Sequence, residues 1–309
     1  MDETKNFLKK LGLPTGDFSG FNDADKKFPD GAQYRFEIPS VEGPRCLKTV
    51  IDEALKYKLT IHRVSQGSGI MLMTDHEIKE MLNMAKDHQM EVSLFVGPRA
   101  TFDIGAQPLT PAGKNIGLGL RGMDQIVYAI EDIKRGCELG LRGILVADLG
   151  LLWVVNQLKK EGQLPSNLVV KISVQLSATN PISVKILEDF GGGTFNVSSD
   201  LPLELLASIR QAVSMPLDLY VETPDNFGGF VRYFEIPKFI RVLSPIYIKL
   251  GLRNAPDIYP SGTHIEETAI ALSKERVRRA KIAADMIQRY YPEALMSQVG
   301  ASDLAIPEV

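Results

Sequence analysis

The stretch Val169-Val170-Lys171-Ile172-Ser173-Val174-Gln175-Leu176-Ser177 alternates between apolar and polar side chains. Every second residue from Val170 to Leu176 is apolar, and the residues between them are polar. A period of two is typical of an extended strand, because successive side chains of a strand point to opposite faces. Two environments fit this pattern: a surface strand with one face in water, or a strand of a closed barrel with a polar interior. The rest of the chain helps to distinguish them.

The opening stretch is one of eight strand-like segments, each followed by a segment with helical periodicity. We expect strands at 34–38, 59–65, 91–97, 142–148, 169–177, 194–198, 217–222 and 246–252. Repeated strand–helix units imply parallel strands with right-handed crossovers, and eight such units close into a (β/α)8 TIM barrel. An open, doubly wound α/β sheet is the alternative, but its strands would be apolar at nearly every position. The alternation therefore favours a barrel with a polar interior.

No linker or low-complexity run divides the 309 residues, so we expect one domain with a short N-terminal extension. Residues 1–32 would form an N-terminal helix and lead-in, residues 33–292 the barrel, and residues 293–309 a C-terminal tail. The segment from Pro98 to Gly122 is rich in glycine and proline and has little periodicity. Because loops of this length inside a compact domain are usually functional or disordered, we expect this segment to act as a lid.

The composition argues against several classes of function. The chain carries 35 basic and 38 acidic residues, so no basic excess indicates a nucleic-acid partner. Its apolar runs fall short of the roughly 20 residues that span a bilayer, and its first residues lack the apolar core of a signal peptide. We therefore expect a cytoplasmic protein without a membrane partner. The two cysteines, Cys46 and Cys137, are too few for a disulfide framework or an iron–sulfur cluster.

The alternation also assigns polar side chains to the barrel interior, and their positions along the strands assign their depth. Active sites of TIM barrels lie at the C-terminal ends of the strands. Near that end we place four candidate catalytic residues and six candidate substrate-binding residues. The candidate catalytic residues are Glu37, Asp148, Glu222 and Lys249, and the candidate binding residues are Arg99, Gln175, Asn196, Ser198, Arg253 and His264.

A second set of polar residues lies deeper, at Arg35, Lys171, Ser173 and Asp218. Buried charges persist when they are paired or hydrogen-bonded, so an ion pair between Arg35 and Asp218 would be a reasonable structural element. The pattern does not decide whether His62 or Arg63 faces inward.

The residues near the C-terminal end combine carboxylates, guanidinium groups and an amine. Arg99 and Arg253 have the forked geometry that suits a carboxylate or a phosphate. Lys249 could act as an electrophile, as a base or as a Schiff-base amine, and Glu222 or Asp148 could act as a general base. The three candidate catalytic carboxylates could instead share a divalent cation with water. The sequence does not choose between these roles, so the metal and the cofactor stay open.

Familiar catalytic motifs are absent from the sequence. It contains no G-x-S-x-G elbow, no H-E-x-x-H, no P-loop and no dinucleotide fingerprint. With four histidines in the whole chain, we expect neither a histidine-rich metal centre nor a Ser-His-Asp triad.

The segment Val174-Gln175-Leu176-Ser177-Ala178-Thr179-Asn180-Pro181, followed by Leu187 and Phe190-Gly191, resembles the peptidase U32 family. That family has Gln and Ser in this strand, Asn after it and Leu-Gly before the next strand. The strand Asp218-Leu219-Tyr220-Val221-Glu222 is similar to the family's acidic-x-aromatic-Val-His pattern, with Glu222 in place of the histidine. The resemblance covers residues 140–250 and implies a barrel with a ligand site near Gln175, Ser198 and Glu222.

The chain departs from the family where Asp225-Asn226-Phe227-Gly228-Gly229 replaces the family's cysteine cluster. The resemblance therefore implies no iron–sulfur cluster here, and it supplies no defined nucleophile for a peptidase. We expect an enzyme that acts on a small anionic carbonyl compound, as a lyase, an isomerase or an amide hydrolase. A U32-like peptidase or hydrolase and a non-catalytic ligand-binding barrel are the alternatives, and a homo-oligomer stays open.

Overall fold

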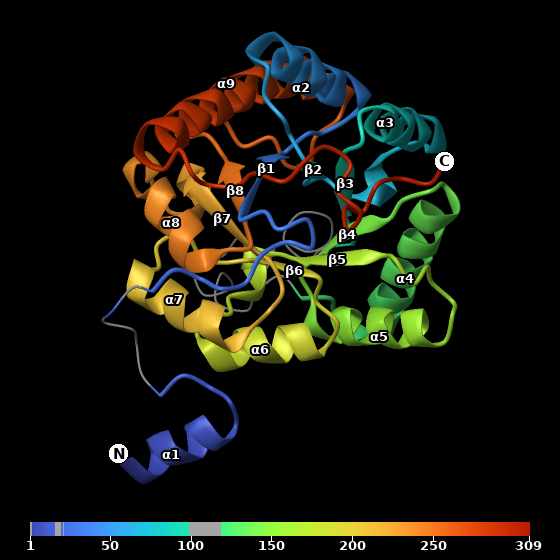
Figure 1. The fold of residues 1–309 in the computed structure, drawn as a ribbon. Coiled ribbons are helices and arrows are strands. Elements are labelled where there is room, and N and C mark those ends of the chain that lie inside the picture. Colours follow the sequence, from blue (N-terminus) through green and yellow to red (C-terminus); the bar gives the residue numbers. More distant parts are fainter. Residues whose placement is uncertain (1, 16–19, 21, 99–118) are drawn as a thin grey trace.

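The computed structural model of the chain describes residues 2–15, 20, 22–98 and 119–309. Eight parallel strands close into a barrel in sequence order, which confirms the predicted (β/α)8 TIM barrel (Figure 1). The strands are β1 (Tyr34–Pro39), β2 (Arg63–Gln66), β3 (Glu91–Phe95), β4 (Gly143–Val146), β5 (Val169–Ile172), β6 (Thr194–Asn196), β7 (Leu217–Glu222) and β8 (Ile246–Leu250).

Helices alternate with the strands and surround the barrel. They are α2 (Pro44–Tyr57), α3 (Asp75–Asp87), α4 (Gly122–Glu138), α5 (Leu149–Lys160), α6 (Pro181–Asp189), α7 (Leu203–Ala212), α8 (Ile236–Leu243) and α9 (Glu266–Tyr290), with α1 (Asp2–Lys10) before the first strand. Thr74 caps α3 through a reciprocal capping box with Glu77, which explains where that helix begins. No helix of the described ranges combines the length and apolar character needed to cross a membrane.

The strand at the opening stretch is shorter than predicted. β5 ends at Ile172, and Val174–Leu176 form a single 3-10 turn. The Ser173 side chain accepts a hydrogen bond from the Gln175 backbone N–H at 3.2 Å, and this local bond replaces strand pairing. The polar residues that follow Ile172 therefore turn over the end of the barrel.

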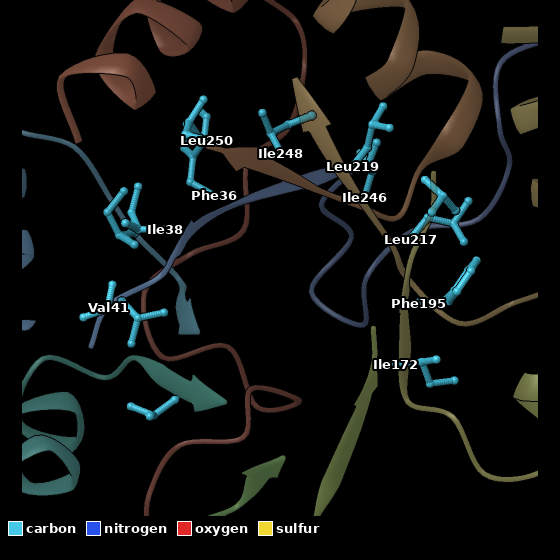
Figure 2. Close-up of a cluster of buried hydrophobic side chains, with 14 of the residues drawn as sticks. Phe36, Ile38, Val41, Ile172, Phe195, Leu217, Leu219, Ile246, Ile248 and Leu250 are labelled. Carbon is cyan, nitrogen blue, oxygen red and sulfur yellow. The ribbon is translucent and has the colours of Figure 1, made fainter. Parts of the chain in front are cut away.

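The apolar side chains of the strands point outward to the helices, as the alternation predicts. Figure 2 shows this layer at the closure of the barrel, where β1, β7 and β8 meet. Its members are fully or almost fully buried and include Phe36, Ile38, Ile172, Phe195, Leu217, Leu219, Ile246, Ile248 and Leu250. Since these positions alternate with polar ones, the other face of each strand supplies the barrel interior.

The N-terminal end of the barrel is covered by both ends of the chain, which cross it in Figure 1. Phe28 lies against the Arg35 guanidinium, 3.9 Å from ring centroid to Cζ. The C-terminal segment supplies Asp303, whose carboxylate oxygens accept from both Arg35 Nη atoms at 3.0 and 2.6 Å. The Ser297 hydroxyl accepts from Arg35 Nε at 2.8 Å. This end of the barrel is therefore closed. A site is expected at the opposite end, where the strands end, because active sites of TIM barrels lie there.

Candidate functional site

Four charged side chains fill the middle of the barrel and form what we call the interior ionic network: Glu37, Arg63, Lys171 and Asp218. All four are at most 1% exposed. Arg63 Nη2 donates to Glu37 Oε2 and to Asp218 Oδ1, both at 2.5 Å. Lys171 Nζ donates to Glu37 Oε2 at 2.7 Å and also to the Asp218 carboxylate. Each charge in the network therefore has an opposite charge in contact with it.

This network corrects two points of the sequence interpretation. The expected Arg35–Asp218 pair was wrong, because Arg35 binds Asp303 and Asp218 binds the network. Arg63 is the residue that faces inward, whereas the His62 ring accepts from the Phe36 N–H at 3.2 Å through Nδ1.

Glu37, a candidate catalytic residue, belongs to the network. Burial opposes its ionisation, but Arg63, Lys171 and Lys249 together hold the pKa of its carboxyl well below the ordinary range. Burial also lowers the pKa of Lys171 to about 8, with a further contribution from Arg63. The Glu37 carboxylate thus stays ionised and fully engaged, which suits it to hold a cation in place.

A pocket opens directly above the network, at the C-terminal end of the strands. We call it the mouth pocket; its polar and aromatic lining includes Ser173, Gln175, Asn196, Tyr220, Lys249 and Tyr259. Its empty volume is about 520 Å³, open solvent at its entrance included. The structure therefore brings three predicted site residues, Gln175, Asn196 and Lys249, into one pocket.

Lys249 is the cationic residue of this lining, and it is 4% exposed. Its Nζ donates to Asn196 Oδ1 at 2.5 Å and lies 3.4 Å from Glu37 Oε1. The same atom lies 4.1 Å from the centroid of the Tyr220 ring. Burial lowers the pKa of the Lys249 amine below its ordinary value, although Glu37 and Asp218 oppose this shift. A lowered pKa increases the fraction of neutral amine, which is the nucleophilic form.

Gln175 contributes an acceptor that is left without a partner. Its Oε1 is buried and has no hydrogen bond to any described residue. Buried polar atoms are rarely left unsatisfied, because the loss of hydrogen bonding to water is not compensated. The 3-10 turn that follows β5 therefore presents an amide oxygen to which a bound molecule could donate.

Asp148 and Glu222, the two predicted general bases, do not line the mouth pocket. Asp148 caps α5, and its carboxylate accepts from the N–H groups of Leu151 and Leu120, both at 2.8 Å. Glu222 accepts from the Tyr233 hydroxyl at 2.8 Å and lies 3.3 Å from Arg279 Nε.

Glu222 does not line the mouth pocket because the pairing of β7 with β8 shifts between Tyr220 and Glu222. The shift breaks the alternation by which Glu222 would have followed Tyr220 into the barrel. No three His, Cys, Asp or Glu residues of the described chain gather closely enough to hold a metal ion. The hypothesis that Glu37, Asp148 and Glu222 share a cation was therefore wrong.

The remaining candidate binding residues lie away from the mouth pocket or outside the described residues. Arg253 pairs with Asp225 at 2.8 Å, and its side chain is 52% exposed. His264 is exposed beside the start of α9, and Ser198 follows β6 without lining the pocket. Arg99 lies outside the described residues, as does most of the segment from Pro98 to Gly122.

The sequence interpretation missed Tyr259, which comes from the loop after β8. A Cβ atom added to Gly67 would lie 2.2 Å from the Tyr259 ring, so only glycine fits beside it. The Gly67-Ser68-Gly69 stretch was the one available signal of this close approach. The Tyr259 hydroxyl is hydrogen-bonded to the Ser40 hydroxyl, which closes one wall of the mouth pocket.

No family model matches the chain, and no curated protein matches it either. Among solved structures, a U32 peptidase is 15% identical, with 78% of this chain and 99% of that chain covered and a TM-score of 0.44. A truncated 3-deoxy-D-arabino-heptulosonate 7-phosphate synthase from Thermotoga maritima is 12% identical, with 86% and 90% covered and a TM-score of 0.49. The putative copper homeostasis protein CutC from Streptococcus agalactiae is 13% identical, with 70% and 98% covered and a TM-score of 0.44. Similarity at this level assigns no activity, and membership of the U32 family is not shown.

Proposed function

We propose that the protein is an enzyme that acts on a small anionic carbonyl compound through an imine formed at Lys249. The observation that carries this proposal is the placement of Lys249: a buried amine with a lowered pKa, held at the floor of the mouth pocket by Asn196. Amines in such surroundings are the ones that attack carbonyl groups at neutral pH.

In the proposed step, the neutral Lys249 Nζ attacks the carbonyl carbon, and a nitrogen–carbon bond forms. The carbonyl oxygen takes up protons and leaves as water, so that amine and carbonyl give imine and water. The protonated imine carries a positive charge where the Tyr220 ring and the Glu37 carboxylate already face a cation, at 4.1 and 3.4 Å from Nζ. Both groups stabilise that charge without reorganisation.

A protonated imine withdraws electrons from the adjacent carbon. It therefore favours cleavage of a neighbouring carbon–carbon bond or removal of a neighbouring proton. These are the reactions of lyases and isomerases, and the proposal favours them over the amide hydrolase that the sequence leaves open.

Reductive trapping tests the proposal. The full chain is incubated with a panel of 2-oxoacids and small phosphorylated aldehydes and ketones, reduced with sodium cyanoborohydride, and analysed by peptide mass spectrometry. We expect one compound to add a single reduced adduct on the peptide that contains Lys249, and Lys249→Met to lose it. Lys274→Met, which changes an exposed lysine on α9, should keep the adduct.

Adducts spread equally over surface lysines, at the same level in the wild type and in Lys249→Met, would contradict the proposal. Tight binding of a panel compound without any adduct at Lys249 would favour the non-catalytic ligand-binding barrel instead.

A further inference from the structure

Arg276 on α9 is a buried arginine with few hydrogen-bond partners. It is 4% exposed, and its Nη1 makes one long hydrogen bond of 3.4 Å to the Ser40 carbonyl. Its Nε is buried and has no hydrogen-bond partner among the described residues. Glu42 is the acidic residue whose charge acts on Arg276. Its carboxylate already accepts hydrogen bonds from the N–H groups of Gly67 and Ser68, at 2.8 and 3.0 Å.

The other buried arginines of the described chain have more partners than Arg276. Arg35 and Arg63 each pair with carboxylates. Arg210 donates to the four backbone carbonyls of residues 213, 215, 243 and 245. A buried guanidinium without such partners is unfavourable unless something else supplies them. Arg210 also lacks a carboxylate in contact, and its Nε also has no partner among the described residues, but its two Nη atoms make four hydrogen bonds. Arg276 is therefore the buried arginine of the described residues with the fewest partners, and none of their carboxylates contacts it.

Arg276 also lines a second pocket, which lies between the loops that follow β7 and β8. Its empty volume is about 710 Å³, open solvent included. Four residues line both this pocket and the mouth pocket: Ser40, Tyr220, Phe227 and Tyr259. The two pockets are thus neighbours, and one molecule could extend from Arg276 towards Lys249.

We propose that Arg276 binds the oxyanion, phosphate or carboxylate, of the compound whose carbonyl group reaches Lys249. This inference rests on the proposed function and names its substrate class: a small carbonyl compound that carries an oxyanion at the end remote from the reacting carbon. The planar guanidinium has its Nε–H and Nη–H groups available for two parallel bonds to such an oxyanion.

The acidic residues of the second pocket do not cancel this preference. Asp225 forms an ion pair with Arg253 and also accepts from the Asn254 N–H at 2.5 Å. Asp257 is exposed, and its carboxylate accepts from the Tyr259 N–H at 3.1 Å, so solvent screens its charge. Arg276 is the buried charge of this pocket's lining.

The test measures anion binding without any carbonyl chemistry. The melting temperature of the full chain is followed while sodium phosphate, sodium acetate or sodium chloride is added at matched ionic strength. We expect phosphate or acetate to raise it above the chloride series, with phosphate alone indicating a phosphate compound and acetate alone a carboxylate. Arg276→Met should weaken the binding of that anion ~tenfold or more, because charge-assisted hydrogen bonds are lost.

The matched control is Arg278→Met, two positions further along α9, where the arginine is exposed and paired with Glu275. This variant should keep the wild-type response to the anion. Arg276→Met should melt at or above the wild-type temperature when no anion is present, because it removes an unpaired buried charge. A structural role would instead give a lower melting temperature and an unchanged anion response, and that result would overturn the proposal.

A second measurement covers the case in which Arg276→Met does not fold. The Nε–H signal of Arg276, assigned by comparison with Arg276→Lys, should shift in NMR spectra of the wild type as the anion is added. An anion series indistinguishable from chloride in both measurements would overturn the proposal. Since inorganic anions form no imine, failure of the Lys249 trapping experiment leaves this test intact, and the two failures can be told apart.

Discussion

The two ends of the barrel differ in how well their buried polar groups are paired. Towards the N-terminal end, Arg35 and Arg63 contact carboxylates, and the C-terminal segment binds Arg35. Arg210 Nε is the buried guanidinium atom there without a partner among the described residues. Towards the C-terminal end, Gln175 Oε1, Thr223 Oγ1 and Arg276 Nε are buried without partners among the described residues. The charges in contact at the N-terminal end are thus largely compensated, whereas the C-terminal end has several buried polar atoms that no described residue satisfies.

The difference shows that polarity inside a barrel does not by itself mark a site. Glu37 and Lys171 are as buried and as charged as any catalytic group, yet they satisfy each other. The unsatisfied groups are more informative, although the Ser93 hydroxyl, deep in the described part of the barrel, also lacks a partner. What distinguishes the C-terminal end is that Gln175 lines the mouth pocket and Arg276 lines the second pocket, whereas Ser93 and Arg210 line neither of these two pockets.

The largest effect is expected from Arg63→Met, which would leave Glu91 without a cation in contact and Glu37 and Asp218 to share Lys171. Removal of one partner from a buried ionic cluster leaves uncompensated charge, and we expect a loss of about 3–5 kcal/mol in the free energy of unfolding. Urea denaturation measures it. Arg278→Met, at an exposed pair, should change the same quantity by no more than about 0.5 kcal/mol. A change in Arg63→Met as small as this control would mean that the network is not needed for stability.

A smaller effect is expected from acid at the same closed end, through His62. Burial lowers the pKa of His62 from 6.5 to about 4, and its Nε2 donates to the Ser297 carbonyl while Nδ1 accepts from a backbone N–H. The unfolded chain takes up the proton below pH 6.5, and the folded chain only near pH 4. Stability therefore falls as the pH falls through this window, by about 3 kcal/mol in total.

His62→Gln isolates this contribution, because glutamine can keep one donor and one acceptor and does not titrate. Its stability should depend less steeply on pH between 6.5 and 4 than that of the wild type. The free energy of unfolding of both proteins is measured by urea denaturation at several pH values. If it fell equally steeply with pH in both, the closed end would not depend on a neutral His62.

The barrel itself could be predicted because its signal is repeated. Eight alternating segments each carry the same information, so an error in one boundary, such as the early end of β5 at Ile172, leaves the fold unchanged. The depth of Lys171, Asp218 and Lys249 also follows from their positions along the strands. This reasoning placed Lys249, Asn196 and Gln175 near the C-terminal end, and the mouth pocket contains all three.

The positions of the other candidate residues depend on strand register and helix capping, which the alternation of side chains does not predict. A register shift in β7 moved Glu222, and the capping of α5 occupied Asp148. The alternation of the strands gives no signal for Arg276, because this residue comes from helix α9 and lines the second pocket from outside the strands. Pairing of this kind is decided by three-dimensional packing, which a single sequence does not reveal.

The smallest effect on stability is expected at the open end, from Lys249→Met. Removal of Lys249 leaves Glu37 in contact with Arg63 and Lys171, so no carboxylate is left unpaired. It also removes an amine whose pKa burial already lowers, which is a charge that the fold stabilises poorly. We therefore expect urea denaturation to show a change of no more than about 1 kcal/mol, in either direction, although this variant would lose the proposed imine chemistry. A loss as large as that of Arg63→Met would mean that Lys249 supports the fold like the closed end, and the distinction between the two ends would fail.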